Sequence, residues 1–193
     1  MTRRGVVYIA FGKQYDYQCL CSAVILRHFT NLPIFVITNL AERSLGWRNV
    51  PGVEFDYHPS PNPEEDKRNR AVKTSLDLYS PFDVTLFCDT DTAVQTGEFE
   101  RGFDEAEKHD AMFSIRNVAT VRGHLPDLNY KKAFDQFKMT FPATIYKEGV
   151  FFFKKGEGTR RLFSIWLDCW EKMAVGRDMP PLFAACQLAQ GVD

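Results

Sequence analysis

The sequence has almost no net charge and no long hydrophobic run, and both absences exclude classes of protein. Its 24 Lys and Arg residues nearly balance 25 Asp and Glu residues, which leaves a formal net charge of -1. Without a basic excess, we expect no nucleic-acid binding driven by bulk charge. No stretch approaches the roughly 20 apolar residues that a transmembrane helix needs, so we expect no membrane span.

Cysteine, proline and glycine are also scarce. The five cysteines are odd in number and scattered, and none has the spacing of paired zinc ligands, so we expect free thiols and a reducing, cytoplasmic setting. The apolar run Val6–Phe11 is too short for a secretion signal. With ten Pro, twelve Gly and 45% hydrophobic residues, the composition predicts one folded domain over residues 1–193.

Apolar segments of strand and helix length alternate along the chain. Strands are predicted at Gly5–Phe11, Ile34–Ile37, Val53–Tyr57, Val84–Cys88, Ala111–Ile115 and Gly149–Phe153. Helices are predicted at Tyr15–Phe29, Ala71–Tyr79, Phe99–His109 and Thr159–Met173. In the first helix, the buried stripe is predicted to be Leu20, Val24, Ile25 and Phe29. This order predicts an α/β fold, a Rossmann-related α/β/α sandwich with a mostly parallel central sheet.

Two carboxylates follow one of the predicted strands. Asp89 and Asp91, with Thr90 between them, come directly after Val84–Cys88. Ligands collect at the carboxyl ends of strands in open α/β sheets, and two carboxylates there could hold a hard divalent cation that also coordinates phosphate. The alternative from the residues alone is an acidic turn that closes the strand.

Basic residues precede the same strand. Arg70 and Lys73 are three apart on a predicted helix, so they share a face and could reach one diphosphate, although alone they could equally form a solvated basic stripe. A glycine-containing loop, Lys155–Arg161, opens the last predicted helix. It lacks the Walker pattern, and a turn with Thr159 as helix N-cap is favoured over a phosphate loop.

The ordered series of these motifs carries a resemblance. Its parts are Val6–Gly12 with Tyr15, Arg70 with Lys73, Phe82–Val94, Gly149–Lys154 and Trp166. Together they resemble the nucleotide-diphospho-sugar transferases of the GT-A fold, most of all the branch of glycogenin and the lipopolysaccharide galactosyltransferases. The resemblance implies a metal-dependent glycosyltransferase that moves a hexose from a nucleotide diphosphate sugar, expected to be a UDP-sugar, to an acceptor hydroxyl.

The resemblance also implies roles for individual residues. The donor nucleotide would contact Ala10, Phe11, Gly12, Tyr15, Arg70, Lys73, Asp89, Thr90 and Asp91. Of these, Asp89 and Asp91 would hold Mn²⁺ or Mg²⁺. Asp178 matches a late Asp of the family near the reacting sugar, and either Glu148 or Asp178 could be the base of an inverting reaction. The family branch favours a retaining reaction, which could proceed without a base.

The sequence departs from the family pattern at three places. Lys147 and Glu148 stand where relatives often have Asn and Ser or Thr, and Met179 replaces a Gln after Asp178. The C-terminal metal-binding His has no counterpart, so the domain is expected to lack a C-terminal metal-ligand and acceptor segment or to complete its site differently.

Two alternatives remain open at this point. The first is a haloacid-dehalogenase-like phosphatase, in which Asp89 would be the nucleophile and Asp91 the acid and base. That motif normally follows the first strand of its fold, whereas here it lies in the middle of the chain. The second is a degenerate, non-catalytic nucleotide-binding protein.

Acceptor contacts are expected from two loops, Pro59–Arg68 and Asn117–Lys138. The first of them is also the segment predicted to be mobile. The donor sugar, the base, the acceptor and the oligomeric state stay undetermined.

Overall fold

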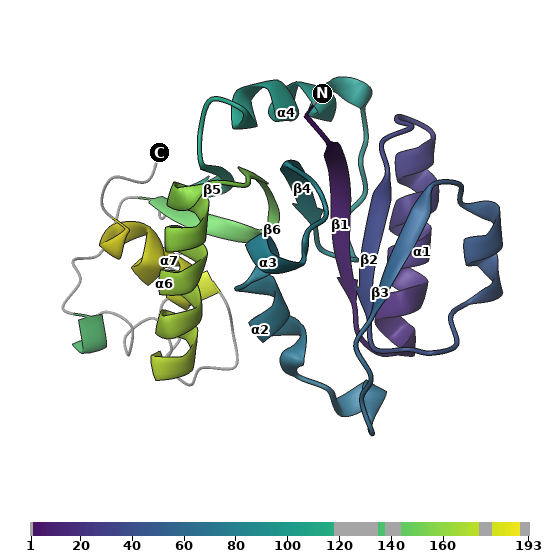
Figure 1. The fold of residues 1–193 in the computed structure, drawn as a ribbon, viewed down its shortest axis with the longest axis horizontal. Helices are drawn as coiled ribbons and strands as arrows, with labels where there is room; N and C mark the ends of the chain where they lie inside the picture. The colour runs from purple at the N-terminus through teal and green to yellow at the C-terminus, as the bar shows by residue number, and fades with distance from the viewer. Residues whose placement is uncertain (1, 118–134, 138–143, 174–178, 190–193) are drawn as a thin grey trace.

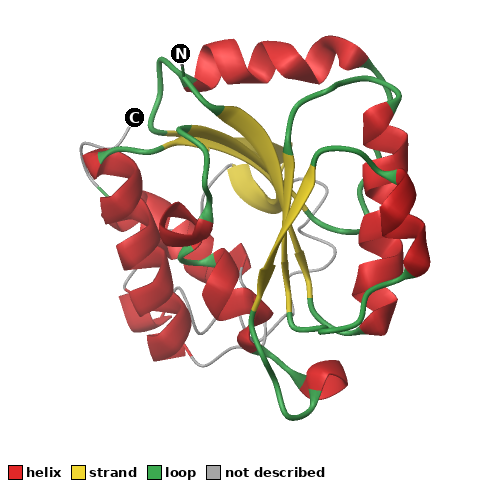
Figure 2. Ribbon diagram, turned by 45° about the vertical axis from the view of Figure 1, so that its right-hand side comes forward, coloured by secondary structure: helices red, strands yellow, loops and turns green. Residues whose placement is uncertain are grey.

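A central sheet between two layers of helices forms the fold (Figure 1, Figure 2). The computed structural model describes residues 2–117, 135–137, 144–173 and 179–189. Within these residues the sheet has six strands, in the order β3-β2-β1-β4-β6-β5. The strands are β1 (Arg4–Ala10), β2 (Ile34–Thr38), β3 (Val53–Tyr57), β4 (Val84–Cys88), β5 (Ala111–Asn117) and β6 (Thr144–Lys154). The predicted α/β/α architecture is confirmed.

The helices are mostly those that the sequence predicts. The α-helices are α1 (Lys13–Arg27), α2 (Arg68–Lys73), α3 (Leu76–Tyr79), α4 (Arg101–Ala106), α6 (Glu157–Met173) and α7 (Met179–Leu188). Short 3₁₀ turns are η1 (Leu45–Asn49), η2 (Pro63–Glu65) and η3 (Gly97–Glu100). No helix of the described segments is both long and apolar enough to cross a bilayer.

Strand direction changes only at β6 among the described strands. The pairs β3–β2, β2–β1 and β1–β4 are parallel, whereas β6 runs antiparallel to both β4 and β5. The sheet is therefore mostly parallel, as predicted. Because Cys88 at the end of β4 pairs with Val150, the second half of β6 pairs with β4, and its first half continues past the carboxyl end of β4.

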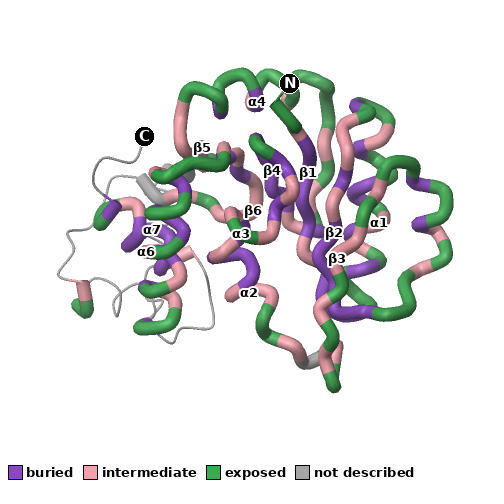
Figure 3. Tube along the Cα trace, in the orientation of Figure 1, coloured by how far each residue is buried: buried purple, intermediate pink, exposed green. Residues whose placement is uncertain are grey.

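The central strands are largely buried (Figure 3), and apolar residues cover both faces of the sheet, as strands covered on two sides require. On one face, Tyr8 and Val36 pack with Leu26 of α1. On the other, Phe151 of β6 packs with Trp166 of α6. The ring centroid of Phe151 lies 5.0 Å from that of Phe87 and 6.0 Å from that of Trp166. Aromatic packing thus stabilises β4 at Phe87, two residues before the first carboxylate of the predicted pair.

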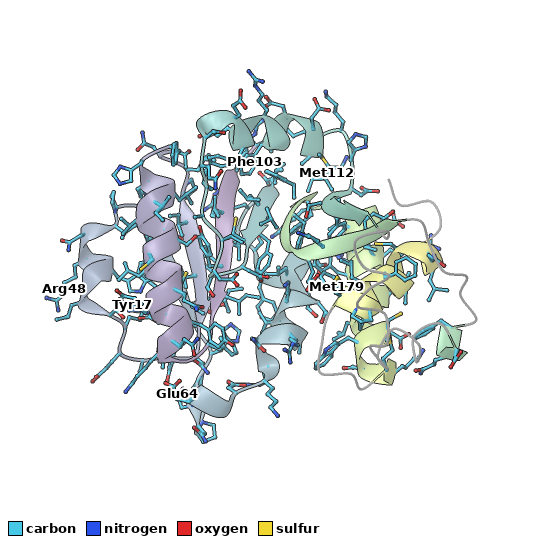
Figure 4. The ribbon with its side chains drawn as sticks, turned by 180° about the vertical axis from the view of Figure 1, so that it is seen from behind. Tyr17, Arg48, Glu64, Phe103, Met112 and Met179 are labelled. Atoms are coloured by element: carbon cyan, nitrogen blue, oxygen red, sulfur yellow. The ribbon has the colours of Figure 1, made fainter. Side chains whose placement is uncertain are left out.

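The buried stripe predicted for the first helix is wrong for three of its four residues, and only Leu20 packs partly buried against the core. Val24, Ile25 and Phe29 are 43%, 37% and 38% exposed. The side of α1 that faces the sheet consists of Asp16, Cys19, Ser22, Ala23 and Leu26. Small residues let the helix approach the sheet closely, and the polar ones find partners: Ser22, for example, hydrogen-bonds to Tyr8 at 3.0 Å. Tyr17, also on α1, is 64% exposed and lies on the outer side of the helix (Figure 4).

Two further details differ from the sequence predictions. The helix predicted at 71–79 is broken into α2 and α3 around Thr74, whose buried hydroxyl donates to the carbonyl of Ala71 at 3.0 Å. Thr159 is not an N-cap, because α6 begins at Glu157; its hydroxyl instead donates to the carbonyl of Asp110 at 2.8 Å. The five cysteines, all within the described residues, are free thiols as predicted.

Candidate functional site

A pocket of about 190 Å³ opens where the carboxyl ends of β1 and β4 meet. Its walls are Ile9, Tyr15, Gln18, Asn69, Arg70, Lys73, Phe87, Asp89, Thr90, Asp91 and Glu148. The chain leaves β1 toward β2 on one side and returns to β4 on the other, so the two strands flank a topological switch point. Open α/β sheets bind ligands at such points.

The Asp89 carboxylate is held from two sides. The ammonium of Lys73 lies 3.0 Å from Oδ1 and 5.0 Å from the centroid of the Phe87 ring. The backbone N–H of Asp89 donates to the carbonyl of Gly149 at 2.7 Å, and a Cβ at Gly149 would lie only 2.9 Å from Oδ2. The Lys73 side chain is 8% exposed and that of Asp89 is 38% exposed. This ion pair is therefore a partly buried element of the pocket wall.

The turn after β4 is fixed to the rest of the domain by hydroxyl groups. Thr92 donates through Oγ1 to the carbonyl of Asp89 at 2.6 Å, and Ser22 of α1 donates to the carbonyl of Thr92 at 2.5 Å. Thr90 is buried and donates to the side-chain carbonyl of Gln18 at 3.2 Å. Asp91, by contrast, is exposed, so its carboxylate faces water at the same pocket.

The turn between β1 and α1 borders the pocket. Ala10 and Phe11 are buried, and the N–H of Gly12 donates to Oδ1 of Asn39 at 2.8 Å. Gly12 has φ +87°, a conformation that glycine adopts without strain. Of the four residues in this region that the resemblance assigns to the donor nucleotide, Tyr15 lines the cavity, Ala10 ends β1, and Phe11 and Gly12 form the turn that follows. Their contact with a nucleoside stays a prediction.

The segment predicted to be a mobile loop makes several hydrogen bonds. Glu64 accepts from the N–H of Lys13 at 3.0 Å, and Asn39 donates to the carbonyl of Pro63 at 2.9 Å. Arg68 donates to Oδ2 of Asp66 at 2.6 Å, and these bonds hold the pKa of Asp66 well below its ordinary value. The segment is thereby tied to the start of α1 and to the end of β2.

Of the two candidate catalytic carboxylates, only Glu148 belongs to the described residues. Glu148 of β6 lines the pocket together with Asp89 and Asp91. Asp178 lies outside the described residues. Sequence reasoning missed two polar residues of the wall, Gln18 and Asn69. Gln18 falls three residues after Tyr15 on the same helix face, and that spacing was the one signal available for it.

The acidic residues of the pocket suit a hard cation bound together with a ligand. Asp89 and Asp91 supply oxygen ligands, the type that Mg²⁺ and Mn²⁺ prefer. Among the described residues, no group of three or more His, Cys, Asp or Glu side chains is arranged to hold a metal ion. Mg²⁺ usually keeps waters and binds through one or two carboxylates plus substrate phosphates, so two carboxylates suffice.

Comparison with solved structures identifies the fold. No protein-family model matches the sequence, and no curated protein matches it. The galactosyltransferase LgtC, solved in complex with donor and acceptor sugar analogs, superposes with a TM-score of 0.64 at 15% identity, over 93% of this chain and 69% of that one. The bifunctional glycosyltransferase WbbM gives 0.63 at 14% identity, over 95% and 37% of the two chains. The glycosyltransferase GlyE of Streptococcus pneumoniae TIGR4 gives 0.58 at 12% identity, over 97% and 43%. The chain therefore has the fold of the GT-A glycosyltransferases.

Proposed function

We propose that the protein is a glycosyltransferase that moves a hexose from a UDP-sugar to an acceptor hydroxyl with the help of Mn²⁺ or Mg²⁺. The observation that carries the proposal is the joint placement of two carboxylates, Asp89 and Asp91, and two cations, Arg70 and Lys73, in one pocket at the switch point. On this fold, LgtC has been solved with donor and acceptor sugar analogs, which supports the same pair of ligands here.

Each group of the pocket has a role that its chemistry suits. Arg70 and Lys73 bind the diphosphate, and the half-exposed ring of Tyr15 offers a face on which a base can stack. Asp89 and Asp91 would hold the divalent cation, which would supply positive charge next to a departing diphosphate. These groups favour cleavage of the bond between the sugar and the diphosphate, because that step places negative charge on the leaving group.

The proton of the acceptor hydroxyl needs a destination. In an inverting reaction Glu148 accepts it, since this carboxylate of the pocket is not assigned to the cation. In a retaining reaction the leaving phosphate accepts it and no base is needed. Glu148→Gln tests this role: an inverting enzyme with Glu148 as its base would lose about 10²-fold or more in kcat, whereas a retaining enzyme, or one with Asp178 as its base, would keep most of its rate.

Donor binding is the first test of the proposal. With Mn²⁺ present, UDP should raise the melting temperature of the wild-type protein. The variants Asp89→Asn and Asp91→Asn should each lose most of this shift. Asp91→Asn should keep the melting temperature of the free protein, because Asp91 is exposed, whereas Asp89→Asn leaves the buried Lys73 ammonium with a neutral partner and is therefore compared with its own ligand-free protein. Asp104→Asn is the matched control, because Asp104 is exposed on α4, where it pairs with Arg4 at the amino end of β1 (Figure 1). If both pocket variants keep the wild-type shift, the proposal is wrong.

Turnover then separates the proposal from the alternatives. The phosphatase is not favoured, because the carboxylate pair follows β4 of a glycosyltransferase fold and not the first strand. Release of UDP from UDP-sugars with Mn²⁺, abolished by EDTA, supports the transferase. UDP binding without any such turnover would identify a non-catalytic nucleotide-binding protein.

A further inference from the structure

The ion pair between Lys73 and Asp89 occupies one of the two carboxylates assigned to the cation. The ammonium lies 3.0 Å from Oδ1, and the Lys73 side chain is almost completely buried. A buried ammonium is stable only with a partner, and here the carboxylate and the Phe87 ring surround it. Before any ligand arrives, Asp89 is thus already neutralised by a charge that belongs to the protein.

A divalent cation and this ammonium need the same oxygen atoms. The other oxygen, Oδ2, lies close to the backbone at Gly149, since a Cβ added there would be 2.9 Å from it, so a cation reaches Asp89 from the side of the pocket on which the ammonium stands. A cation bound to Asp89 would stand against the ammonium, and two positive charges so close repel each other strongly in a partly buried site. Metal binding to the protein alone is therefore opposed by Lys73.

A diphosphate would remove the obstacle. Lys73 is the last residue of α2, and Arg70, one turn earlier, lines the same pocket. A lysine carries its charge on a flexible four-carbon stem, so the ammonium can move to a phosphate oxygen while the backbone stays in place. Asp89 is then released for the cation.

We propose that Lys73 competes with the divalent cation for Asp89, so that the cation binds firmly only when a nucleoside diphosphate has taken the ammonium. This inference rests on the proposed function for the identity of the diphosphate. Lys73 is then a positioning residue that links the binding of the two ligands.

Metal binding without nucleotide tests the competition directly. The probe is Mn²⁺ alone, measured from the loss of the free-ion signal in electron paramagnetic resonance. Lys73→Met should bind Mn²⁺ about 10- to 100-fold more tightly than wild type, because the ionic hydrogen bond that the metal must break is gone. Lys73→Gln, which can still donate a neutral hydrogen bond to Asp89, should show a smaller gain and serves if the Met variant does not fold.

Two controls separate competition from a general change in charge. Arg70→Met removes the same charge from the same pocket, and we expect no more than about threefold tighter Mn²⁺ binding from the weaker field alone. Adding Asp89→Asn to Lys73→Met should abolish the gain. The inference is overturned if Lys73→Met binds Mn²⁺ no more tightly than wild type, or if Arg70→Met gains as much.

The nucleotide gives an independent readout. In wild type, UDP should tighten Mn²⁺ binding by a larger factor than in Lys73→Met, since only wild type must first free Asp89. If wild type binds UDP with Mn²⁺ and transfers sugar but Lys73→Met gains no metal affinity, this inference alone fails. If neither the wild-type protein nor Lys73→Met binds UDP, but Lys73→Met still binds Mn²⁺ more tightly than wild type, the proposed function fails and the competition stands.

Discussion

Replacing Gly149 by Ala should displace the Asp89 carboxylate without unfolding the protein. The added Cβ would lie 2.9 Å from Oδ2, whereas ordinary van der Waals contact begins near 3.4 Å. The carboxylate must therefore move by about 0.5 Å. Gly149 is not among the described glycines with a positive φ, so the backbone itself accepts a side chain.

The expected loss falls on ligand binding. A displacement of about 0.5 Å is the tolerance of a preorganised site, and about 1 Å can cost on the order of 100-fold in rate. We expect Gly149→Ala to weaken the binding of UDP with Mn²⁺ by about tenfold. The free energy of unfolding should stay within about 1 kcal/mol of wild type, because the end of a side chain gives way and the alanine reduces the freedom of the unfolded chain.

Calorimetric titration with UDP in excess Mn²⁺ measures the first quantity, and urea unfolding measures the second. Gly97→Ala is the matched control, because its Cβ would meet only the carbonyl of Phe29, at 3.8 Å. Wild-type affinity in Gly149→Ala would show that the position of the Asp89 carboxylate does not govern ligand binding. A loss of more than about 2 kcal/mol in stability would instead place the clash within the sheet.

Two predictions concern stability. The carboxylate of Asp16, which is 1% exposed, accepts hydrogen bonds from the N–H and hydroxyl of Ser44 and from the indole of Trp47. Asp16→Ala should therefore lower the free energy of unfolding by about 3 kcal/mol. Urea unfolding measures this loss, and a value below about 1 kcal/mol would contradict the prediction. Hydrogen bonds from the Arg68 guanidinium keep the pKa of Asp66 low in the folded protein. The contribution of Asp66 to stability is therefore present above about pH 4, the pKa of an aspartate in the unfolded chain, and is lost as the pH falls below that value. Urea unfolding should therefore show a shallower acid dependence in Asp66→Asn than in wild type, and equal slopes would refute it.

Most strands were predictable from short apolar or alternating runs, whereas β6 begins at Thr144, five residues before the predicted run, because its first half includes the charged residues Lys147 and Glu148. Both Val53–Tyr57 and Val84–Cys88 have the predicted bounds, and the first two strands differ from prediction by at most two residues at either end. The direction of β6 was not predictable. Gly149–Phe153 is apolar throughout because both faces of the sheet are covered, and such a run carries no signal of direction.

The face of α1 was mispredicted for a related reason. Apolar residues surround this helix, so its periodicity does not single out one side. The side that packs on the sheet includes Asp16, and its burial depends on partners in η1, which follows β2 in the sequence. The periodicity of a sequence carries no information about such long-range hydrogen bonds.

The candidate site was more predictable than its internal contacts. Tyr15, Arg70 and Glu148 were expected near the carboxylate pair, and the pocket contains all of them. The contact between Lys73 and Asp89 could not be foreseen, because it depends on where α2 ends. That end is set by the break at Thr74, which the helical pattern of the sequence does not reveal.

The reversed direction of β6 decides which segments can take part in the site. Had β6 been parallel to β4, the residues after Phe153 would stand next to Asp89. Because β6 is antiparallel, Lys154 pairs with Val84 at the amino end of β4. The glycine-containing segment that follows therefore lies at the opposite end of β4 from the carboxylate pair. At Gly158, in the first turn of α6, an added Cβ would lie 2.0 Å from the Asp110 carboxylate, a neighbour that repels phosphate. Phosphate binding is thus disfavoured there, and β6 contributes to the pocket through Glu148 and through the close approach of Gly149 to Asp89.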